Sequence, residues 1–394
     1  MHLSNGEDAE PKSSRFALWQ LGFRPFYLLA SIFAALSIVL WAAQYLGWLN
    51  TGYLPGPLWH AHEMLYGFTV AVMAGFLLTA VRNWTDQPTP TGGWLMAIAA
   101  LWIGGRILIV TRFAWLSALA NAAFPIAVAF SIAIPLVRSR SRRNYFFIAL
   151  LVALGLATFY VHASQILGWQ TPAWLGIRVG LDIAMLIMTI MAGRVIPMFT
   201  ANAIPGANAR RHLLVERASI ASVFLLTALD AFGVDGALLV TVLVLAALSH
   251  GVRWWLWAPG KTFRTPLVWV LHAAYAWIPI HLALRAASAL HLVASPLATH
   301  ALTVGAIGGL TIGMMTRTAK GHTGRPLRAD AADSVCYGLI LAAAVARVTG
   351  PLLLPAAYGA WVLISAALWS GGFAVYALRY SGPLTHARVD GRPG

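Results

Sequence analysis

The sequence predicts an all-α polytopic membrane protein with about 12 transmembrane helices and both termini in the cytoplasm. Of its 394 residues, 59% are hydrophobic and only 10% are charged, whereas about a quarter of the residues of an average soluble domain are charged. The apolar residues form runs of roughly twenty, the length at which a helix crosses the hydrocarbon core of a bilayer. The basic residues gather in alternate connections between these runs.

Twelve apolar runs follow one another, joined by short connections that often contain proline or glycine. The first run is too long for a cleavable signal peptide, so we expect it to remain as a span. We expect a single transmembrane domain over 21–380, a disordered cytoplasmic tail over 1–20 and a cytoplasmic tail over 381–394. The predicted spans are 26–49, 59–81, 94–111, 113–137, 145–168, 173–199, 213–233, 236–257, 267–290, 297–316, 334–354 and 356–378.

The net charge of +15 is explained by its position along the chain. Arginines and lysines crowd the N-terminal arm, the connection at 138–143 and the connection at 317–328, while the intervening connections carry few. This is the positive-inside pattern of a protein in a lipid bilayer, and it predicts no nucleic-acid partner. The single cysteine, Cys336, excludes an intramolecular disulfide and a thiolate-rich metal site, so histidine, carboxylate or methionine would have to bind any metal.

The segment Trp59-His60-Ala61-His62-Glu63 opens the second span with three titratable groups in four residues. Such groups rarely enter a span, because each loses water and needs a partner. His60 and His62 project about 200° apart on a regular helix, whereas His60 and Glu63 share a face. We therefore predict different partners for the two histidines; the alternative is that His60 precedes the regular helix, in which case both could bind one metal. Glu63 is predicted to deliver protons or to hydrogen-bond a ligating histidine.

Further histidines lie at a similar depth on other spans. The topology places His300 near the outer end of the tenth span, His162 in the outer third of the fifth and His281 near the middle of the ninth. Imidazole is the commonest protein ligand of haem iron, copper and zinc, so this convergence indicates a shared metal site. The alternative is that each histidine only satisfies a local hydrogen bond. His272 lies nearer the cytoplasm, and His322 falls in a cytoplasmic connection.

Arg194 and Arg317 lie near the cytoplasmic ends of the sixth and tenth spans. Each guanidinium is a candidate to clamp a propionate or another anion, and each equally suits anchoring at lipid headgroups. Gly305, Gly309 and Gly313 repeat at every fourth residue of the tenth span. They form a smooth face for a neighbouring helix or, alternatively, for a flat macrocycle.

Several motifs together resemble those of the NnrS family. They extend in the family's order from residue 21 to residue 327, so the resemblance covers most of the chain. This sequence has Tyr66 where the family commonly has phenylalanine, which argues against an essential pair of Tyr66 and His62. The motifs are Leu21-Gly22-Phe23-Arg24-Pro25-Phe26, Trp59-His60-Ala61-His62-Glu63-Met64, Arg82-Asn83-Trp84-Thr85, Gly193-Arg194-Val195-Ile196-Pro197, His300-Ala301-Leu302-Thr303-Val304-Gly305 and Gly321-His322-Thr323-Gly324-Arg325-Pro326-Leu327.

The resemblance implies a multi-pass protein of the bacterial inner (cytoplasmic) membrane that contains haem, of b type, and copper. It further implies that the protein takes nitric oxide as ligand or substrate and protects against nitrosative stress. Together with depth, it favours His60, His62 and His300 as metal ligands of an outer site. His272 is a further candidate ligand, and His322 would serve a cytoplasmic site or order the loop between Lys320 and Arg325.

Reduction of two nitric oxide molecules to nitrous oxide needs two electrons and two protons. Glu63 is the predicted proton relay, and the electrons must come from an external donor, because the chain has no motif for haem-c attachment or dinucleotide binding. Capture or sensing of nitric oxide, or delivery of haem or copper, would require no turnover. The rival function is a secondary transporter with proton coupling through histidine and Glu63. Against it, the eighth span lacks a counterpart of the histidine-rich segment of the second.

Overall fold

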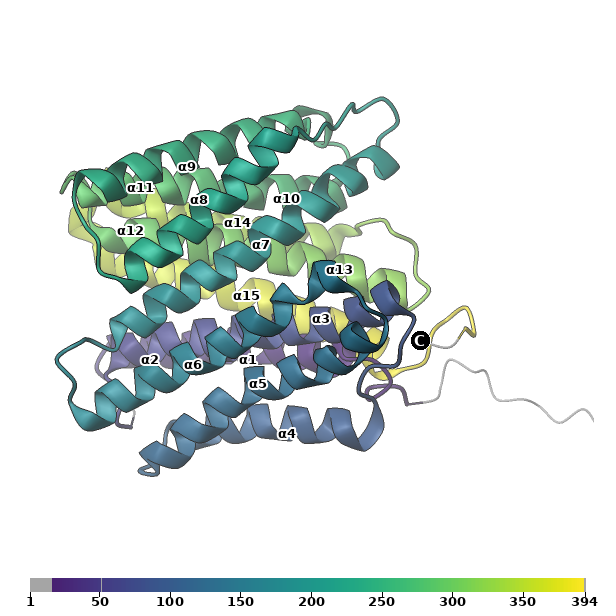
Figure 1. Cartoon of the computed structure of the whole chain (residues 1–394), viewed down its shortest axis with the longest axis horizontal. Coiled ribbons are helices and arrows are strands. Elements are labelled where there is room, and N and C mark those ends of the chain that lie inside the picture. The colour runs from purple at the N-terminus through teal and green to yellow at the C-terminus, as the bar shows by residue number, and fades with distance from the viewer. Residues whose placement is uncertain (1–15, 51, 393–394) are drawn as a thin grey trace, which may run out of the picture.

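The computed structural model describes residues 16–50 and 52–392, and within them the chain is a bundle of twelve antiparallel helical segments (Figure 1). Ten of these segments are long and apolar enough to cross a membrane. The other two are α4, which has 17 residues, and α8, which has 19. The segments in chain order are α1 (Phe23–Tyr45), α2–η2–α3 (Gly56–His62, Glu63–Thr69, Val70–Thr85), α4 (Gly92–Leu108), α5 (Ala114–Arg138), α6 (Phe146–Leu167), α7 (Trp174–Ala203), α8 (Leu213–Ala231), α9 (Ala237–Leu256), α10–α11 (Pro266–Tyr275, Trp277–Ala289), α12–η5–α13 (Ser295–His300, Ala301–Gly308, Gly309–His322), α14 (Ala331–Leu353) and α15 (Tyr358–Thr385).

Each of the twelve predicted spans coincides with one of these helical segments, so the predicted all-α membrane fold is confirmed. The boundaries differ by several residues. The second segment, for example, covers Gly56–Thr85 where the sequence predicts 59–81. Hydropathy identifies the part of a helix that lies in lipid, whereas hydrogen bonding continues the helix into the polar interface.

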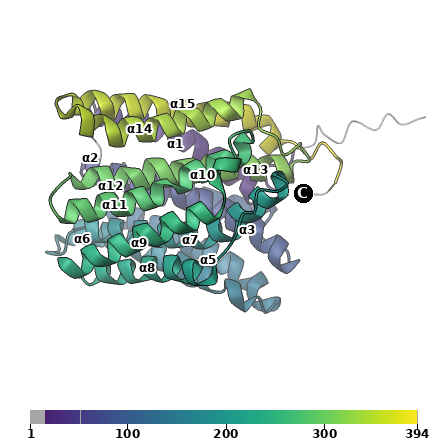
Figure 2. The same cartoon turned by 90° about the horizontal axis from the view of Figure 1, so that it is seen from above.

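Both described ends of the chain meet at one end of the bundle, which we call the terminal end (Figures 1 and 2). Phe16 forms a β-bridge with His386, and the Ala17 N–H donates to the Thr385 carbonyl at 2.7 Å. An even number of spans requires this arrangement. The opposite end, where α2 and α12 begin, is called the histidine end because it holds His60 and His300.

The predicted C-terminal tail over 381–394 begins too early, because α15 continues to Thr385. Arg24 explains the extension. Its Nη1 donates to the carbonyls of Pro383, Leu384 and His386 at 3.3, 3.2 and 2.8 Å, and so satisfies acceptors that a helix end leaves without an intrahelical partner.

Of the predicted N-terminal tail over 1–20, residues 1–15 lie outside the described residues, and the remaining part is attached to the bundle. Besides the contacts of Phe16 and Ala17, the Trp19 carbonyl accepts a hydrogen bond from the Gly92 N–H at 2.8 Å. Residues 16–20 are therefore held against the bundle by backbone hydrogen bonds rather than forming a free tail.

The second and tenth membrane segments share an unusual construction. Each begins at the histidine end with a short α-helix that ends in a histidine, His62 or His300. Each continues as a π-helix, η2 or η5, before returning to α-helix. A π-helical turn is rare and occurs frequently at functional sites. The same device on two helices thus marks the histidine end before any side-chain contact is considered.

The glycine face of the tenth segment packs against the ninth. A Cβ atom added at Gly305 would collide with Trp277, and one at Gly309 would collide with Ala274. At Gly313 it would lie 2.8 Å from Val270. Of the two uses predicted for these glycines, the structure therefore supports close approach of helices rather than a surface for a macrocycle.

Candidate functional site

His60 and His300 come together at the histidine end from the second and tenth membrane segments. The two side chains are close enough to interact electrostatically. The His60 ring stacks on Trp41, with ring centroids 4.6 Å apart and planes inclined by 17°. Nδ1 of His300 lies 2.6 Å from the Pro296 carbonyl. Because a carbonyl only accepts, Nδ1 carries the proton and Nε2 keeps its lone pair, which is how ligating histidines are commonly oriented.

Arg347 belongs to α14, which packs against α12 and η5, and its guanidinium lies within electrostatic range of both imidazoles. Its side chain is buried, with an exposed fraction of 8%. Nη2 donates to the Tyr358 hydroxyl at 2.9 Å, and Nη1 has no hydrogen-bond partner. The pair of histidines therefore shares its surroundings with a guanidinium that still has a free donor.

His62 points into a separate, fully buried network. Its Nδ1 lies 2.9 Å from Glu63 Oε1, and its Nε2 lies 3.0 Å from the Thr158 hydroxyl. Glu63 Oε1 also accepts a hydrogen bond from Arg106 Nη1 at 2.8 Å. A proton on Nδ1 satisfies the carboxylate, and Nε2 then accepts from Thr158. Both nitrogens of His62 are thus engaged, and Glu63 contacts His62 and Arg106 rather than His60.

His162 of α6 forms the second histidine pair. Its ring meets the His62 ring edge to face, with centroids 4.7 Å apart. Nδ1 lies 2.5 Å from the Tyr53 hydroxyl, while Nε2 is buried without a hydrogen-bond partner. A metal ion at this pair would take Nε2 of His162 and would have to replace Thr158 at His62. His60 and His62 therefore face different partners, as the helical geometry predicts.

The sequence placed His162 at the depth of the shared metal site but did not assign it to a particular ligand pair. An ion pair is the default role that the sequence predicts for Arg106 inside a span, and Glu63 is its partner. The sequence indicated neither this partner nor the position of Arg347. Arg106 completes the network around Glu63 and also hydrogen-bonds to Asn121. Its partners lie on different helices, so no local pattern indicates them. The ring of Tyr66 packs on His62 at 5.2 Å, and its hydroxyl donates to the Gly176 carbonyl instead.

Two other predicted site residues, Arg194 and His272, lie in the half of the bundle near the terminal end. His272 has Nε2 2.8 Å from the Thr200 hydroxyl, and its Nδ1 is buried without a partner. Arg194 donates to Asn144 Oδ1 at 2.8 Å. Neither residue contacts the outer histidines, so an anion or metal bound here would occupy a different site.

Arg317 and His322 also lie near the terminal end, on the last turns of α13. The Arg317 guanidinium carbon lies 3.6 Å from the centroid of the Phe199 ring. The His322 ring packs against Phe23, with centroids 5.5 Å apart. His322 also lies within electrostatic range of Arg24 and other arginines, which makes its surroundings unfavourable for a metal cation.

The donor set of the histidine end fits haem better than a metal ion held by protein alone. In the described parts of the chain, no group of three or more His, Cys, Asp or Glu side chains is arranged to hold a metal. The macrocycle supplies the equatorial ligands of haem iron, so the protein has to supply only the remaining ones. Two imidazoles such as His60 and His300 therefore suffice for haem, whereas copper at His62 and His162 would need a further ligand from outside the chain.

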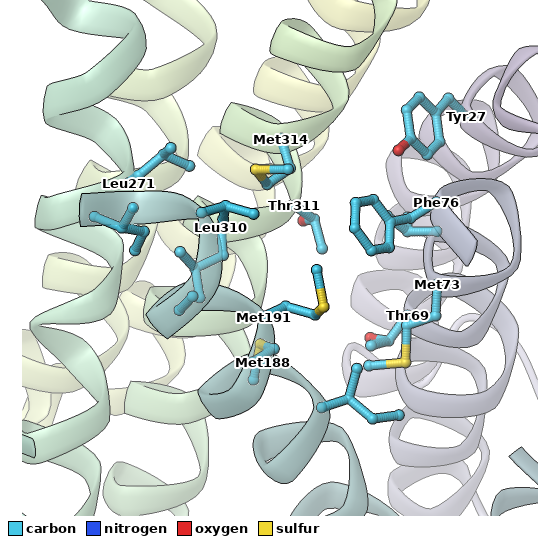
Figure 3. A pocket seen from close by; sticks show the side chains of 15 residues that line it. Tyr27, Thr69, Met73, Phe76, Met188, Met191, Leu271, Leu310, Thr311 and Met314 are labelled. Carbon is cyan, nitrogen blue, oxygen red and sulfur yellow. The ribbon is translucent and has the colours of Figure 1, made fainter. Parts of the chain in front are cut away.

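A pocket of about 90 Å³ opens in the middle of the bundle. It lies between the second, sixth and tenth membrane segments, and apolar side chains line most of it (Figure 3). The hydroxyls of Thr69 and Thr311 in its wall are bound to their own helices. This volume lies below the range of about 300–1,000 Å³ that is usual for pockets of drug-sized ligands, so only a very small molecule fits. Because its lining is apolar, the pocket suits a small uncharged ligand.

The comparisons with known proteins agree with the resemblance found in the motifs. A comparison with curated proteins finds no match. The family model described as NnrS protein matches residues 17–388, which is nearly the whole chain and includes every helix of the bundle. The chain therefore belongs to the NnrS protein family.

Proposed function

We propose that this protein holds haem and copper at its histidine end and binds nitric oxide there, protecting a bacterium from nitrosative stress at its cytoplasmic membrane. Family membership indicates a membrane protein related to nitric oxide. The observation that carries the proposal is the meeting of His60 and His300, two imidazoles from helices far apart in the sequence.

His60 and His300 are the residues that would hold the haem iron, and His62 and His162 are those that would hold copper. Copper would supply a coordination position for nitric oxide, and haem iron would supply one where His60 or His300 is displaced. The chain's own residues orient the ligands. Pro296 fixes the ring of His300, and Glu63 fixes the ring of His62.

The apolar pocket supports nitric oxide rather than an ion as the ligand. Nitric oxide is small and uncharged, so it dissolves in lipid and enters an apolar space without losing strong hydration. The pocket reaches Thr69, the last residue of the π-helix that begins at Glu63. It therefore lies on the same membrane segment as the two histidines of the second span.

Capture of nitric oxide requires no other residue, whereas reduction requires protons and electrons. In the reductive branch, two nitric oxide molecules, two electrons and two protons yield nitrous oxide and water. Glu63 is the proposed proton relay, since it is the carboxylate in contact with His62. The electrons would come from an external donor protein.

The test is an optical spectrum of the purified protein, oxidised, reduced, and reduced with nitric oxide, with iron and copper measured on the same sample. We expect a Soret band that shifts with nitric oxide. His60→Ala and His300→Ala should each abolish it, while His62→Ala and His162→Ala should lower copper and leave haem bound. His212→Ala, at an exposed residue near the terminal end, is the matched control.

Retention of haem by both His60→Ala and His300→Ala would refute the outer site. A wild-type protein without haem and copper, after expression with both supplied, would refute the proposed function. In that case the secondary transporter with histidine and Glu63 as proton-coupling groups becomes the leading interpretation.

A further inference from the structure

Three arginines are buried in the described part of the chain, and their surroundings differ. Arg24 donates to three carbonyls at the end of α15. Arg253 pairs with Glu216, with 2.5 Å between Nη2 and Oε2. Arg347 forms no ion pair with any described carboxylate. Its one side-chain hydrogen bond is to the neutral Tyr358 hydroxyl.

A buried guanidinium without a counterion is unstable. Removing a charged group from water costs several kcal/mol even after relaxation, and arginine does not lose its proton to avoid this cost. Its contact with the Tyr358 ring, at 5.0 Å from the centroid, returns only about 2 kcal/mol when desolvated. The unpartnered Nη1 adds a further cost. An anion from outside the chain would remove both penalties.

We infer that Arg347 binds a carboxylate of the haem held by His60 and His300. The inference rests on the proposed function. Haem carries two propionate carboxylates, and the planar guanidinium binds a carboxylate through parallel hydrogen bonds. α14, which carries Arg347, packs against α12 and η5, the helices that meet at His300, and the guanidinium lies within electrostatic range of both His60 and His300. A single anionic cofactor held by the two histidines is therefore within reach of Arg347.

This assignment replaces the arginines favoured by the sequence. Arg317 follows His300 by seventeen residues along a single helical segment, which separates them by about 25 Å at the helical rise. Arg194 lies in the same half of the bundle as Arg317 and already binds Asn144. A cofactor at the histidine end is therefore out of reach of both residues.

The test compares Arg347→Met and Arg347→Lys with Arg112→Gln, a matched loss of charge at an exposed residue of the same end. The readouts are haem bound per protein, the haem midpoint potential, and the thermal midpoint of haem-free and haem-loaded protein. In Arg347→Met we expect at least threefold less bound haem and a lower midpoint potential, because the oxidised iron loses a nearby positive charge. Arg347→Lys keeps the charge, so its potential should stay near that of the wild type.

The thermal midpoints separate this role from a purely structural one. Replacing an uncompensated charge by methionine should leave haem-free protein as stable as the wild type or more stable. It should also reduce the stabilisation that haem confers. A purely structural arginine would instead lower both midpoints.

Two results would overturn the inference alone. One is wild-type haem content and potential in Arg347→Met. The other is a change in that variant's stability that follows the anionic lipid content of the vesicles rather than haem, which would assign the guanidinium to a lipid phosphate. A wild-type protein that binds no haem overturns the proposed function, and this inference with it.

Discussion

Replacing Glu63 by glutamine isolates the charge at the centre of the buried network. Glutamine matches glutamate in size and keeps an oxygen that accepts from His62 Nδ1, so packing is preserved. The negative charge is lost. Arg106, whose side chain is only 10% exposed and which lies 2.8 Å from Glu63, then has no counterion.

The magnitude follows from this geometry. Removing one partner of a buried ion pair costs about 3–5 kcal/mol. Arg106 keeps its hydrogen bond to Asn121, and its guanidinium lies 5.7 Å from the centroid of the Phe33 ring and 5.9 Å from that of Trp102. These contacts place the expected loss near the lower limit, at about 3 kcal/mol of unfolding free energy.

The assay is reversible unfolding in mixed micelles, followed by tryptophan fluorescence, for a double-mutant cycle. Its members are the wild type, Glu63→Gln, Arg106→Met and the double variant. Because the double variant removes both charges, it should be more stable than Glu63→Gln. The coupling free energy between the two residues should be about 2–3 kcal/mol.

A Glu63→Gln variant as stable as the wild type would refute this reasoning, as would a coupling below about 0.5 kcal/mol. Either result would mean that water reaches Arg106 in the membrane-inserted protein.

Two further perturbations test other parts of the structure. Gly67→Ala should lower the free energy of unfolding by about 1–3 kcal/mol through overpacking, because its Cβ would collide with Arg106 and lie 2.8 Å from Phe33. The control is Gly93→Ala, where nothing lies within 4 Å and stability should not change. Equal thermal midpoints for the two variants would contradict the packing around Gly67. Burial raises the pKa of Asp330, but the hydrogen bond from Arg379 and other interactions outweigh burial and hold that pKa below its usual value. This carboxylate therefore stabilises the fold fully above the unfolded pKa of about 4, and its contribution decreases as the pH falls below that value. Asp330→Asn keeps a helix-capping side chain and should lower the free energy of unfolding by about 0.5–1 kcal/mol at pH 7 and by less below pH 4. If thermal unfolding shows a loss of stability that does not change with pH, the charge of Asp330 is not its cause.

The fold followed from the sequence because membrane insertion is governed by local properties. A run of about twenty apolar residues must form a helix in lipid, where the backbone has no other hydrogen-bond partner. The twelve predicted segments depend on this rule, and only their ends moved. Arg24 extends α15 by donating hydrogen bonds to carbonyls more than 350 residues away in the sequence. A prediction from short stretches of sequence cannot detect a contact at that separation.

The depth of each histidine was also available from the sequence, since it depends on position along a helix of known direction. Depth placed His60, His62, His162 and His300 in one layer, and the structure agrees. Depth also placed His272 apart from them, in agreement with its bond to Thr200.

The pairing of these residues was decided by the tertiary structure alone. Whether His60 faces His300 or His162 depends on the rotation of each helix about its axis and on which helices are neighbours. The π-helices η2 and η5 alter that rotation next to both sites. The sequence by itself therefore determined which groups share a layer of the membrane, because hydropathy fixes depth. Packing decided that Arg347 is the buried guanidinium beside His60 and His300, because lateral contacts depend on all twelve helices at once.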